Sequence, residues 1–423
     1  MTQTVTAAPR KFTYGDYLTW PEEERWEIID GVAYDMTPAP SRIHQEILVD
    51  LVRQISTFLL ESVCRVYAAP FDVRLPEAGE ADADILTVVQ PDIAIVCDPA
   101  KLDVRGCRGA PDVVIEIISP ATAVRDQIHK VALYEKHGVK EYWLVHPTDR
   151  LVTIRLLGTQ GRYDPPRIYE ATGTLPVASL TGLEIDLDAA FRWLQRREEG
   201  RDRESREGSM TQAVSAATRK FTYGDYLTWP EEERWELMDG VAYNMTPAPS
   251  PDHQRLAGDI FRQISTFLLE GPCEVFAAPF DVRLPEAGEA DADILTVVQP
   301  DIAVICDPAK LDERGCRGAP EMIIEIISPS TAAKDQIHKV ALYEKHGVKE
   351  YWLVHPTDRL VTIRLLGADG RYGPPQIYEA TGTLPVVTLP GLEIDLDAAF
   401  RRLQSRNEGK GKGEKAESLG RDV

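Results

Sequence analysis

The stretch from Pro111 to Pro120, PDVVIEIISP, carries the strongest indication of the fold. Its apolar residues occupy both faces of an extended segment, and β-branched runs of this kind are typical of a central strand buried on both sides. Glu116 stands in the middle of the run. A carboxylate in such a place is costly unless it is paired or binds a metal. We therefore expect Glu116 either to hold a metal ion or to pair with a basic side chain.

A second short apolar strand is predicted at residues 90–96, QPDIAIV, with Asp92 at its start. If neighbouring strands carry Asp92 and Glu116, their carboxylates can share a hard cation such as Mg²⁺, which prefers oxygen ligands and retains waters. A metal-bound water is a potential nucleophile toward phosphate. The alternative is that Asp92 merely caps the strand after Pro91.

Two basic side chains are further candidates. Lys130 follows Asp126 by four positions, so it either forms a surface ion pair or points back at the metal centre. His44 begins a predicted helix and is either a polar residue of the helix terminus or a catalytic or substrate-contacting group. Asp72 lies on a strand-like segment, 63–75, and either faces the same site or only meets the neighbourhood of Arg74.

The remaining pattern predicts an α/β domain. Residues 26–34 indicate two strands around a turn at Asp30-Gly31, which Glu27 would serve. Residues 44–60 carry apolar side chains at spacings of three and four and predict an amphipathic helix, with Ser41 as its N-cap. A second helix at 124–137, strands at 141–145 and 151–157, and a final helix at 187–196 follow. This order predicts a mixed central sheet flanked by helices.

The whole pattern occurs twice. His44 matches His253 at an offset of 253 − 44 = 209, and the same offset relates the other candidates. We expect a domain at residues 1–195, a charged linker at 196–209, a second domain at 210–405 and a disordered tail at 406–423. The second set of candidate site residues is His253, Asp281, Asp301, Glu325 and Lys339.

Charge and cysteine usage limit the classes of function. The net charge of −21 argues against non-specific coating of nucleic acid, although a local basic groove or a metal could offset it at a site. The three cysteines of each copy lack zinc-site spacing, so we expect reduced, partly buried thiols. The start of the chain lacks the apolar segment of a signal peptide, and no apolar run approaches the ~20 residues that span a bilayer. We expect a cytoplasmic protein without membrane contact.

Several of these segments form an ordered set that resembles a known family. The set comprises PAPS (38–41) with His44-Gln45, FDVRL (71–75), QPD (90–92), PDVVIEIISP (111–120), Asp126, KVALY (130–134) and GVKEYW (138–143). It covers most of each copy and resembles the bacterial Uma-type family of restriction-endonuclease-like proteins, a branch of the PD-(D/E)XK nuclease superfamily. The resemblance implies a restriction-endonuclease-like fold in each tandem copy, with Asp92 and Glu116 as metal-binding carboxylates and Mg²⁺ as the usual cofactor.

One position departs from the superfamily pattern. The superfamily's lysine stands two residues after the acidic residue, where this chain has Ile118, so Lys130 is the candidate replacement. We expect a Mg²⁺-dependent (or Mn²⁺-dependent) endonuclease acting on DNA, with Asp72 and Asp281 as additional metal ligands and the two copies forming an intramolecular pseudo-dimer. The alternative, favoured by the acidic charge and the missing strand lysine, is a non-catalytic binding or regulatory module. A different hydrolase on the same scaffold is a third possibility.

Overall fold

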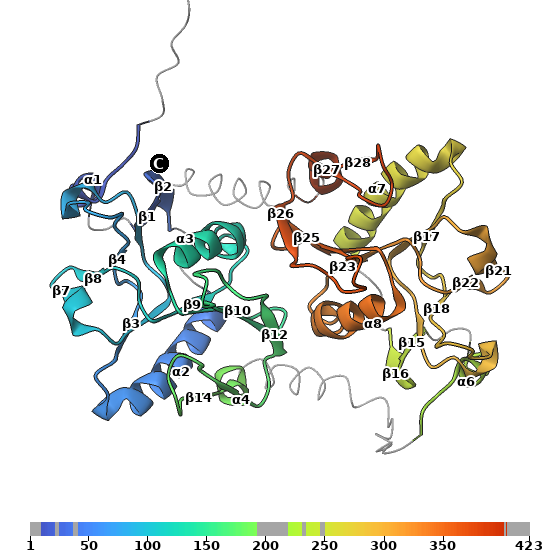
Figure 1. The fold of residues 1–423 in the computed structure, drawn as a ribbon, viewed down its shortest axis with the longest axis horizontal. Coiled ribbons are helices and arrows are strands. Elements are labelled where there is room, and N and C mark those ends of the chain that lie inside the picture. Colours follow the sequence, from blue (N-terminus) through green and yellow to red (C-terminus); the bar gives the residue numbers. More distant parts are fainter. Residues whose placement is uncertain are drawn as a thin grey trace, which may run out of the picture. The chain divides into compact units, whose positions relative to one another are not determined.

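The computed structural model describes residues 10–21, 25–36, 41–192, 219–230, 234–245, 250–401 and 403. The chain divides into two compact units, residues 1–210 and 211–423 (Figure 1). The linker predicted at 196–209 and the tail predicted at 406–423 lie outside the described residues. The two units repeat the same order of strands and helices.

A mixed six-stranded sheet forms the centre of the first unit, in the order β12-β11-β10-β9-β6-β3. β9 pairs with β10 in parallel and with β6 in antiparallel orientation, as the predicted mixed sheet requires. Every residue of β9 is buried, which confirms the strand buried on both faces. The strands are β3 Arg65–Ala68, β6 Ile93–Val96, β9 Val113–Ile117, β10 Glu141–His146, β11 Leu151–Leu156 and β12 Arg167–Glu170.

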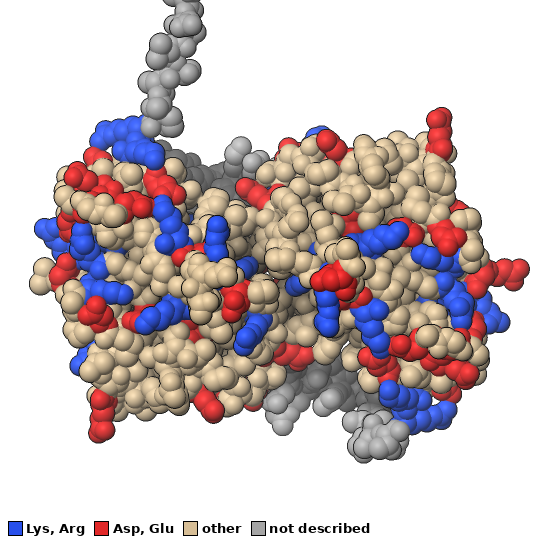
Figure 2. Space-filling view, viewed as in Figure 1, with Lys and Arg blue, Asp and Glu red and all other residues tan. Residues whose placement is uncertain are grey.

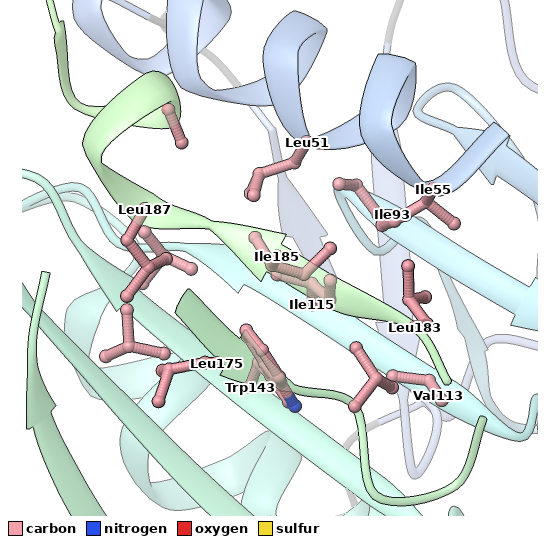
Figure 3. Packing of buried hydrophobic residues seen from close by; sticks show 14 of the residues in the cluster. Leu51, Ile55, Ile93, Val113, Ile115, Trp143, Leu175, Leu183, Ile185 and Leu187 are labelled. Atoms are coloured by element: carbon pink, nitrogen blue, oxygen red, sulfur yellow. The ribbon is translucent and has the colours of Figure 1, made fainter. Parts of the chain in front are cut away.

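The helix α2, Arg42–Phe58, covers one face of this sheet. Its Leu51 and Ile55 pack in one core with Ile93 and Ile115 of the strands (Figure 3). The structure thus confirms the predicted amphipathic helix, which begins two residues earlier than expected. Because the odd-numbered residues of β6 and β9 meet α2, the alternation of side chains along a strand sends the even-numbered residues to the opposite face.

The opposite face is covered by α3, Lys130–His137, which continues from a π-helical segment, η4, Arg125–His129. Figure 1 shows α2 and α3 on opposite sides of β9 and β10. Gly138 ends α3 in the left-handed conformation at φ 84°, which glycine adopts without a steric penalty. Glu116 is an even-numbered residue of β9 and therefore points toward α3 rather than into the core beneath α2.

A second six-stranded sheet, which the sequence pattern did not separate from the first, has the order β2-β1-β5-β4-β8-β7. β1 and β2 form the predicted hairpin, with Asp30 and Gly31 at positive φ in its turn. The segment 63–75, predicted as one strand, is divided between β3 of the central sheet and β4 of the second sheet. The second sheet contains β1 Trp26–Ile29, β2 Val32–Asp35, β4 Val73–Arg74, β5 Val88–Val89, β7 Leu102–Asp103 and β8 Gly106–Arg108.

The first unit is completed by short elements. They are α1 Tyr14–Tyr17, η1 Leu59–Glu61, η2 Asp82–Asp84, η3 Pro99–Lys101, β13 Thr174–Pro176, β14 Glu184–Asp186 and α4 Leu187–Ala190. α4 begins where the final helix was predicted, and residues beyond 192 are outside the described part of this unit. Among the helices of the described residues, none has the length and apolar character needed to cross a membrane.

The second unit has the same two sheets. Its central sheet has β17 Glu274–Ala277, β20 Ile302–Ile305, β23 Met322–Ile326, β24 Glu350–His355, β25 Leu360–Leu365 and β26 Gln376–Glu379. Its second sheet has β15 Trp235–Met238, β16 Val241–Asn244, β18 Val282–Arg283, β19 Val297–Val298, β21 Leu311–Asp312 and β22 Gly315–Arg317. The other elements are α6 Tyr223–Tyr226, α7 Pro251–Phe267, η6 Leu268–Glu270, η7 Asp291–Asp293, η8 Pro308–Lys310, η9 Lys334–His338, α8 Lys339–His346, β27 Thr383–Pro385 and β28 Glu393–Asp395.

The prediction of reduced thiols is wrong for two of the three cysteines in each unit. Cys64 is bonded to Cys97, and the equivalent pair is bonded in the second unit. Cys64 directly precedes β3 and Cys97 directly follows β6, and the antiparallel register pairs Arg65 with Val96. The register therefore brings the two Cα atoms to 3.8 Å, which their sequence spacing does not reveal. Cys107 is a buried thiol as expected, and burial raises its pKa to about 11.

Candidate active site

A buried ammonium group lies at the centre of the site. Nζ of Lys130 is 2.8 Å from Oε1 of Glu27 and 2.9 Å from Oε1 of Glu116. It also lies 3.3 Å from Oδ1 of Asp126. The Lys130 side chain is only 2% exposed. Glu27 comes from β1, Glu116 from β9 and Asp126 from η4, so this cluster joins the two sheets to the helix.

The structure shows a feature of each of the two alternatives for Lys130. The ion pair with Asp126 exists, but it is buried rather than on the surface. The same ammonium also reaches Glu116, as the metal-centre alternative required. A surface pair at this spacing contributes a few tenths of a kcal/mol, whereas removing one partner of a buried pair leaves an uncompensated charge. Lys130 is therefore part of the interior of the site.

Glu27 does not serve the neighbouring turn, and this expectation is wrong. Its side chain is 0% exposed. One oxygen accepts a hydrogen bond from the backbone N–H of Gln90 at 2.9 Å, and the other pairs with Arg125 at 3.1 Å. The signal that could have found Glu27 is the one that drew attention to Glu116: an acidic residue within a short apolar strand, here WEII.

Asp92 and His44 form the more open side of the site. The backbone N–H of Asp92 donates to Oε2 of Glu116 at 3.3 Å. Oδ2 of Asp92 accepts from the N–H of Ile117 at 2.8 Å and lies 3.0 Å from Nε2 of His44. The Asp92 side chain is 17% exposed. His44 therefore sits in the first turn of α2 and also contacts the candidate metal ligand.

The hydrogen bonds of Asp72 do not reach the Lys130 cluster directly. Its Oδ1 accepts hydrogen bonds from the hydroxyl of Tyr17 at 3.1 Å and from Nε2 of Gln90 at 3.0 Å. Gln90 links it indirectly to the cluster, because the backbone N–H of Gln90 bonds Glu27. Burial raises the pKa of Asp72. Its bonds thus lead to Tyr17 and Gln90 rather than to Glu116, and the same arrangement recurs at Asp281.

The site carries more acidic than basic groups. Its four carboxylates belong to Glu27, Asp92, Glu116 and Asp126, and its two fixed cations to Lys130 and Arg125. With all of these ionised, the balance is 2 − 4 = −2 before any proton on His44. Burial raises the pKa of Glu116 well above its usual range, Lys130 opposes that rise, and Asp126 and Asp92 add to it. An additional cation would relieve this excess of negative charge.

The donor set suits a metal that needs few protein ligands. Among the described residues, no three His, Cys, Asp or Glu side chains form a group suited to hold a metal ion. The site instead offers the carboxylates of Asp92 and Glu116, which are linked through the backbone N–H of Asp92 and are close enough for the charge of Asp92 to raise the pKa of Glu116. Mg²⁺ commonly binds through one or two carboxylates and keeps several waters. Oδ2 of Asp92 is engaged by His44 and by the N–H of Ile117, so Oδ1 is a suitable oxygen ligand and the residues fit Mg²⁺.

The second unit keeps the centre of the site and changes its margin. Nζ of Lys339 lies 2.9 Å from Glu236 and 2.7 Å from Glu325. The second cation is Lys334, which stands where the first unit has Arg125 and lies 2.8 Å from Glu236.

The histidine–aspartate contact is also kept, with His253 3.1 Å from Asp301. Burial is the largest single influence and lowers the pKa of His253, but the hydrogen bond and the negative charge of Asp301, with smaller contributions from Ile326 and Asp335, together raise the pKa above its usual value. Near this contact, Arg255 on α7 replaces Glu46 of α2. The two units therefore share the same arrangement of acidic groups and lysine, with different charges around it.

The comparisons with known proteins agree with the duplication of the domain. Residues 14–189 and 223–398 each match the model of the Uma2 family, described as "Putative restriction endonuclease". Over 192 residues the chain is 26% identical to an uncharacterized protein of Synechocystis sp., covering 45% of this chain and 96% of that protein. It is also similar to the crystal structure of "a putative nuclease belonging to DUF820" from Anabaena variabilis, at 21% identity and a TM-score of 0.36, covering 43% of this chain and 99% of that one. Since the two matched stretches together span most of the sequence, the chain belongs to the Uma2 family and contains two tandem copies of its restriction-endonuclease-like domain.

Proposed function

We propose that the chain is a Mg²⁺-dependent endonuclease that hydrolyses phosphodiester bonds of DNA, with one site in each copy. The observation that carries the proposal is the pair Asp92 and Glu116, linked through the backbone N–H of Asp92, with a buried lysine against Glu116. The second copy keeps Asp301, Glu325 and Lys339. The family description supports the reaction class.

Asp92 and Glu116 would hold the metal ion. When bound, Mg²⁺ polarises a phosphoryl oxygen and lowers the pKa of a bound water. The ammonium of Lys130, 2.9 Å from Glu116, favours the charged form of that carboxylate. His44, oriented by Asp92 beside the candidate metal ligands, is placed to accept or donate a proton.

Lys130 is assigned a role toward Glu116 rather than toward the substrate. Its side chain is 2% exposed and its ammonium contacts three carboxylates. An ammonium in that position is already fully engaged and has no free path to a phosphate. We therefore assign the orientation of the water and the stabilisation of the transition state to the metal and to His44, and not to Lys130.

The negative charge of the chain limits the non-specific affinity for DNA that we expect. Figure 2 shows Lys and Arg interspersed with Asp and Glu on the visible face, and the net charge is −21. Non-specific affinity for DNA depends on neutralising phosphates with Lys and Arg. We therefore expect metal-dependent binding at the sites rather than tight coating of the duplex.

The test is cleavage of supercoiled plasmid, single-stranded DNA and RNA in Mg²⁺ or Mn²⁺, with EDTA as the control. Metal-dependent cleavage of DNA supports the proposal. A folded protein that cleaves none of the three substrates contradicts it.

The enclosure of Lys130 also favours a second candidate, a binding module that keeps the nuclease fold without catalysis. A protein of this kind would bind Mg²⁺ or nucleic acid and show no turnover. Cleavage assays and binding assays on the same preparation separate the two functions.

A further inference from the structure

We propose that Glu27 is a positioning residue for the metal site. Its carboxylate balances the positive charge of the Lys130 ammonium, so that the carboxylate of Glu116 is available to bind a metal ion. The inference rests on the proposed function, because it concerns the metal that Asp92 and Glu116 would hold. Glu236 has the same role in the second copy.

The contacts place Lys130 between two acceptors of nearly equal distance. Nζ lies 2.8 Å from Glu27 and 2.9 Å from Glu116. The two carboxylates come from different sheets, since Glu27 is on β1 and Glu116 on β9. Glu27 is fixed independently of Glu116 by the backbone N–H of Gln90 and by Arg125. Glu27 is therefore a rigid alternative partner for the ammonium.

A metal ion and Lys130 compete for the same carboxylate. Oε1 of Glu116 already accepts from Lys130 and from the hydroxyl of Tyr134 at 3.1 Å. A buried ammonium cannot exchange a carboxylate for water, so it must keep an anionic partner inside the protein. Glu27 supplies that partner. Without it, Lys130 would rely on Glu116 and Asp126, and a metal ion would have to overcome a stronger ion pair.

The second copy supports this division of roles. Glu236 and Lys339 keep the contact at 2.9 Å. The neighbouring cation changes from Arg125 to Lys334, which still pairs with Glu236 at 2.8 Å. Both copies thus keep the glutamate and the lysine that it contacts, whereas the second cation is an arginine in the first copy and a lysine in the second.

The experiment is calorimetric titration of the full chain with Mg²⁺, which needs no catalytic activity. The test variant combines Glu27→Gln with Glu236→Gln. We expect its Kd for Mg²⁺ to rise about tenfold or more, as is typical when a group that orients a metal ligand is removed. Circular dichroism and thermal melting check that the variant is folded.

The chain offers a matched control in Glu141→Gln combined with Glu350→Gln. These carboxylates are also 0% exposed and lie on central-sheet strands. Glu141 accepts from the indole N–H of Trp143 and from backbone amides such as that of Ser179, and Glu350 accepts from the same kinds of group and from the Thr388 hydroxyl, rather than from an ammonium. We expect this control to bind Mg²⁺ with the wild-type Kd.

A second comparison separates positioning from simple loss of charge. In a background with Lys130→Met and Lys339→Met, Glu27→Gln with Glu236→Gln should leave the Kd for Mg²⁺ unchanged, because the ammonium through which the glutamates act is gone. If that background does not fold, Glu27→Asp with Glu236→Asp serves instead. These variants keep the negative charge but shorten the side chain that reaches Lys130. A positioning role predicts weaker Mg²⁺ binding in them, whereas a pure charge effect predicts the wild-type Kd.

The outcomes distinguish this inference from the proposed function. If wild type binds Mg²⁺, Glu116→Gln with Glu325→Gln abolishes binding, and Glu27→Gln with Glu236→Gln matches wild type, the inference is overturned and the proposed function stands. Equal losses with and without the lysines, or wild-type affinity in the aspartate variants, overturn the inference in favour of a charge effect. If wild type does not bind Mg²⁺, both are overturned.

Discussion

Lys130 and Glu116 form an ion pair of 2.9 Å inside the first unit, and Lys339 and Glu325 repeat it at 2.7 Å in the second. The lysine comes from the helix that follows the strand, 14 residues after the glutamate. In the superfamily pattern that the sequence resembles, the lysine stands two residues after the acidic residue. That position is occupied by Ile118, which is buried. In this chain the ammonium that contacts Glu116 therefore comes from the helix that follows the strand and not from the strand itself.

The first prediction concerns stability. Lys130→Met removes the cation from a cluster of buried carboxylates and leaves their charges uncompensated. We expect the unfolding free energy of the first unit to fall by about 3–5 kcal/mol, as is typical when one partner of a buried pair is lost. Urea unfolding followed by tryptophan fluorescence measures the change.

The comparison for this variant is Lys140→Met. Lys140 pairs with Asp112 but is 64% exposed, and pairs at the surface contribute about 0–1 kcal/mol. If the two variants lose the same stability, the cluster around Lys130 is not the buried ion-pair network described above.

Much of the central sheet could be predicted from the sequence, because burial leaves a direct trace in the pattern of apolar residues. The run around Glu116 predicted a strand buried on both faces, and the apolar spacing in residues 44–60 predicted the covering helix, which the structure places at residues 42–58. The division of residues 63–75 between two sheets could not be predicted, since both pieces have the same strand-like composition. The register of β3 against β6, and with it the bond between Cys64 and Cys97, could not be predicted either, because it depends on how the strands pair in the folded domain.

The candidate site could be predicted in its parts but not in its contacts. Asp92, Glu116, Lys130 and His44 were selected by position, and the structure places each within hydrogen-bond reach of another member of the site. Glu27 was assigned to a turn because its strand is short and lies far away in sequence. Its partnership with Lys130 arises only when the second sheet packs against the helix.

The second prediction concerns the number of sites. In the full chain, Glu325→Gln alone should leave one working site, and so should Glu116→Gln alone. If the copies act as a pseudo-dimer and each site cuts one strand, these variants nick supercoiled plasmid, whereas wild type linearises it. Agarose electrophoresis of a time course resolves the products. Linearisation by both single variants at the wild-type rate would show that each copy cuts both strands alone.

The third prediction concerns the cysteines. Protein unfolded without reductant should show two reactive thiols per chain, from Cys107 and Cys316, because the other four are bonded in pairs. After reduction the count should rise to six. A thiol-reactive dye under denaturing conditions measures both values. Six thiols before reduction would contradict the disulfides.

The fourth prediction concerns pH. Burial lowers the pKa of His355, at the end of β24, from its usual 6.5 to about 4. The folded pKa lies below the unfolded one, so the unfolded chain binds the proton more tightly in this interval. The contribution of the neutral, buried His355 to the free energy of unfolding is therefore fully present above pH 6.5. It is lost as the pH falls toward 4, which lowers the free energy of unfolding by up to about 3 kcal/mol.

Urea unfolding of wild type and His355→Gln at pH 7 and pH 5 tests this interval. We expect the variant to lose less stability than wild type when the pH is lowered, because the buried imidazole is absent. An identical loss in both proteins would assign the pH dependence to other groups.

The central claim is that Asp92 and Glu116, with their counterparts, form metal-dependent nuclease sites. The most direct measurement is cleavage of supercoiled plasmid in Mg²⁺ by wild type, by Glu116→Gln with Glu325→Gln, and by the control Glu141→Gln with Glu350→Gln. We predict that wild type and the control cleave, that EDTA stops both, and that the Glu116 variant does not cleave although it is folded. Cleavage by the Glu116 variant at the wild-type rate would place the chemistry elsewhere, and a folded wild type without any cleavage in Mg²⁺ or Mn²⁺ would contradict the nuclease account itself.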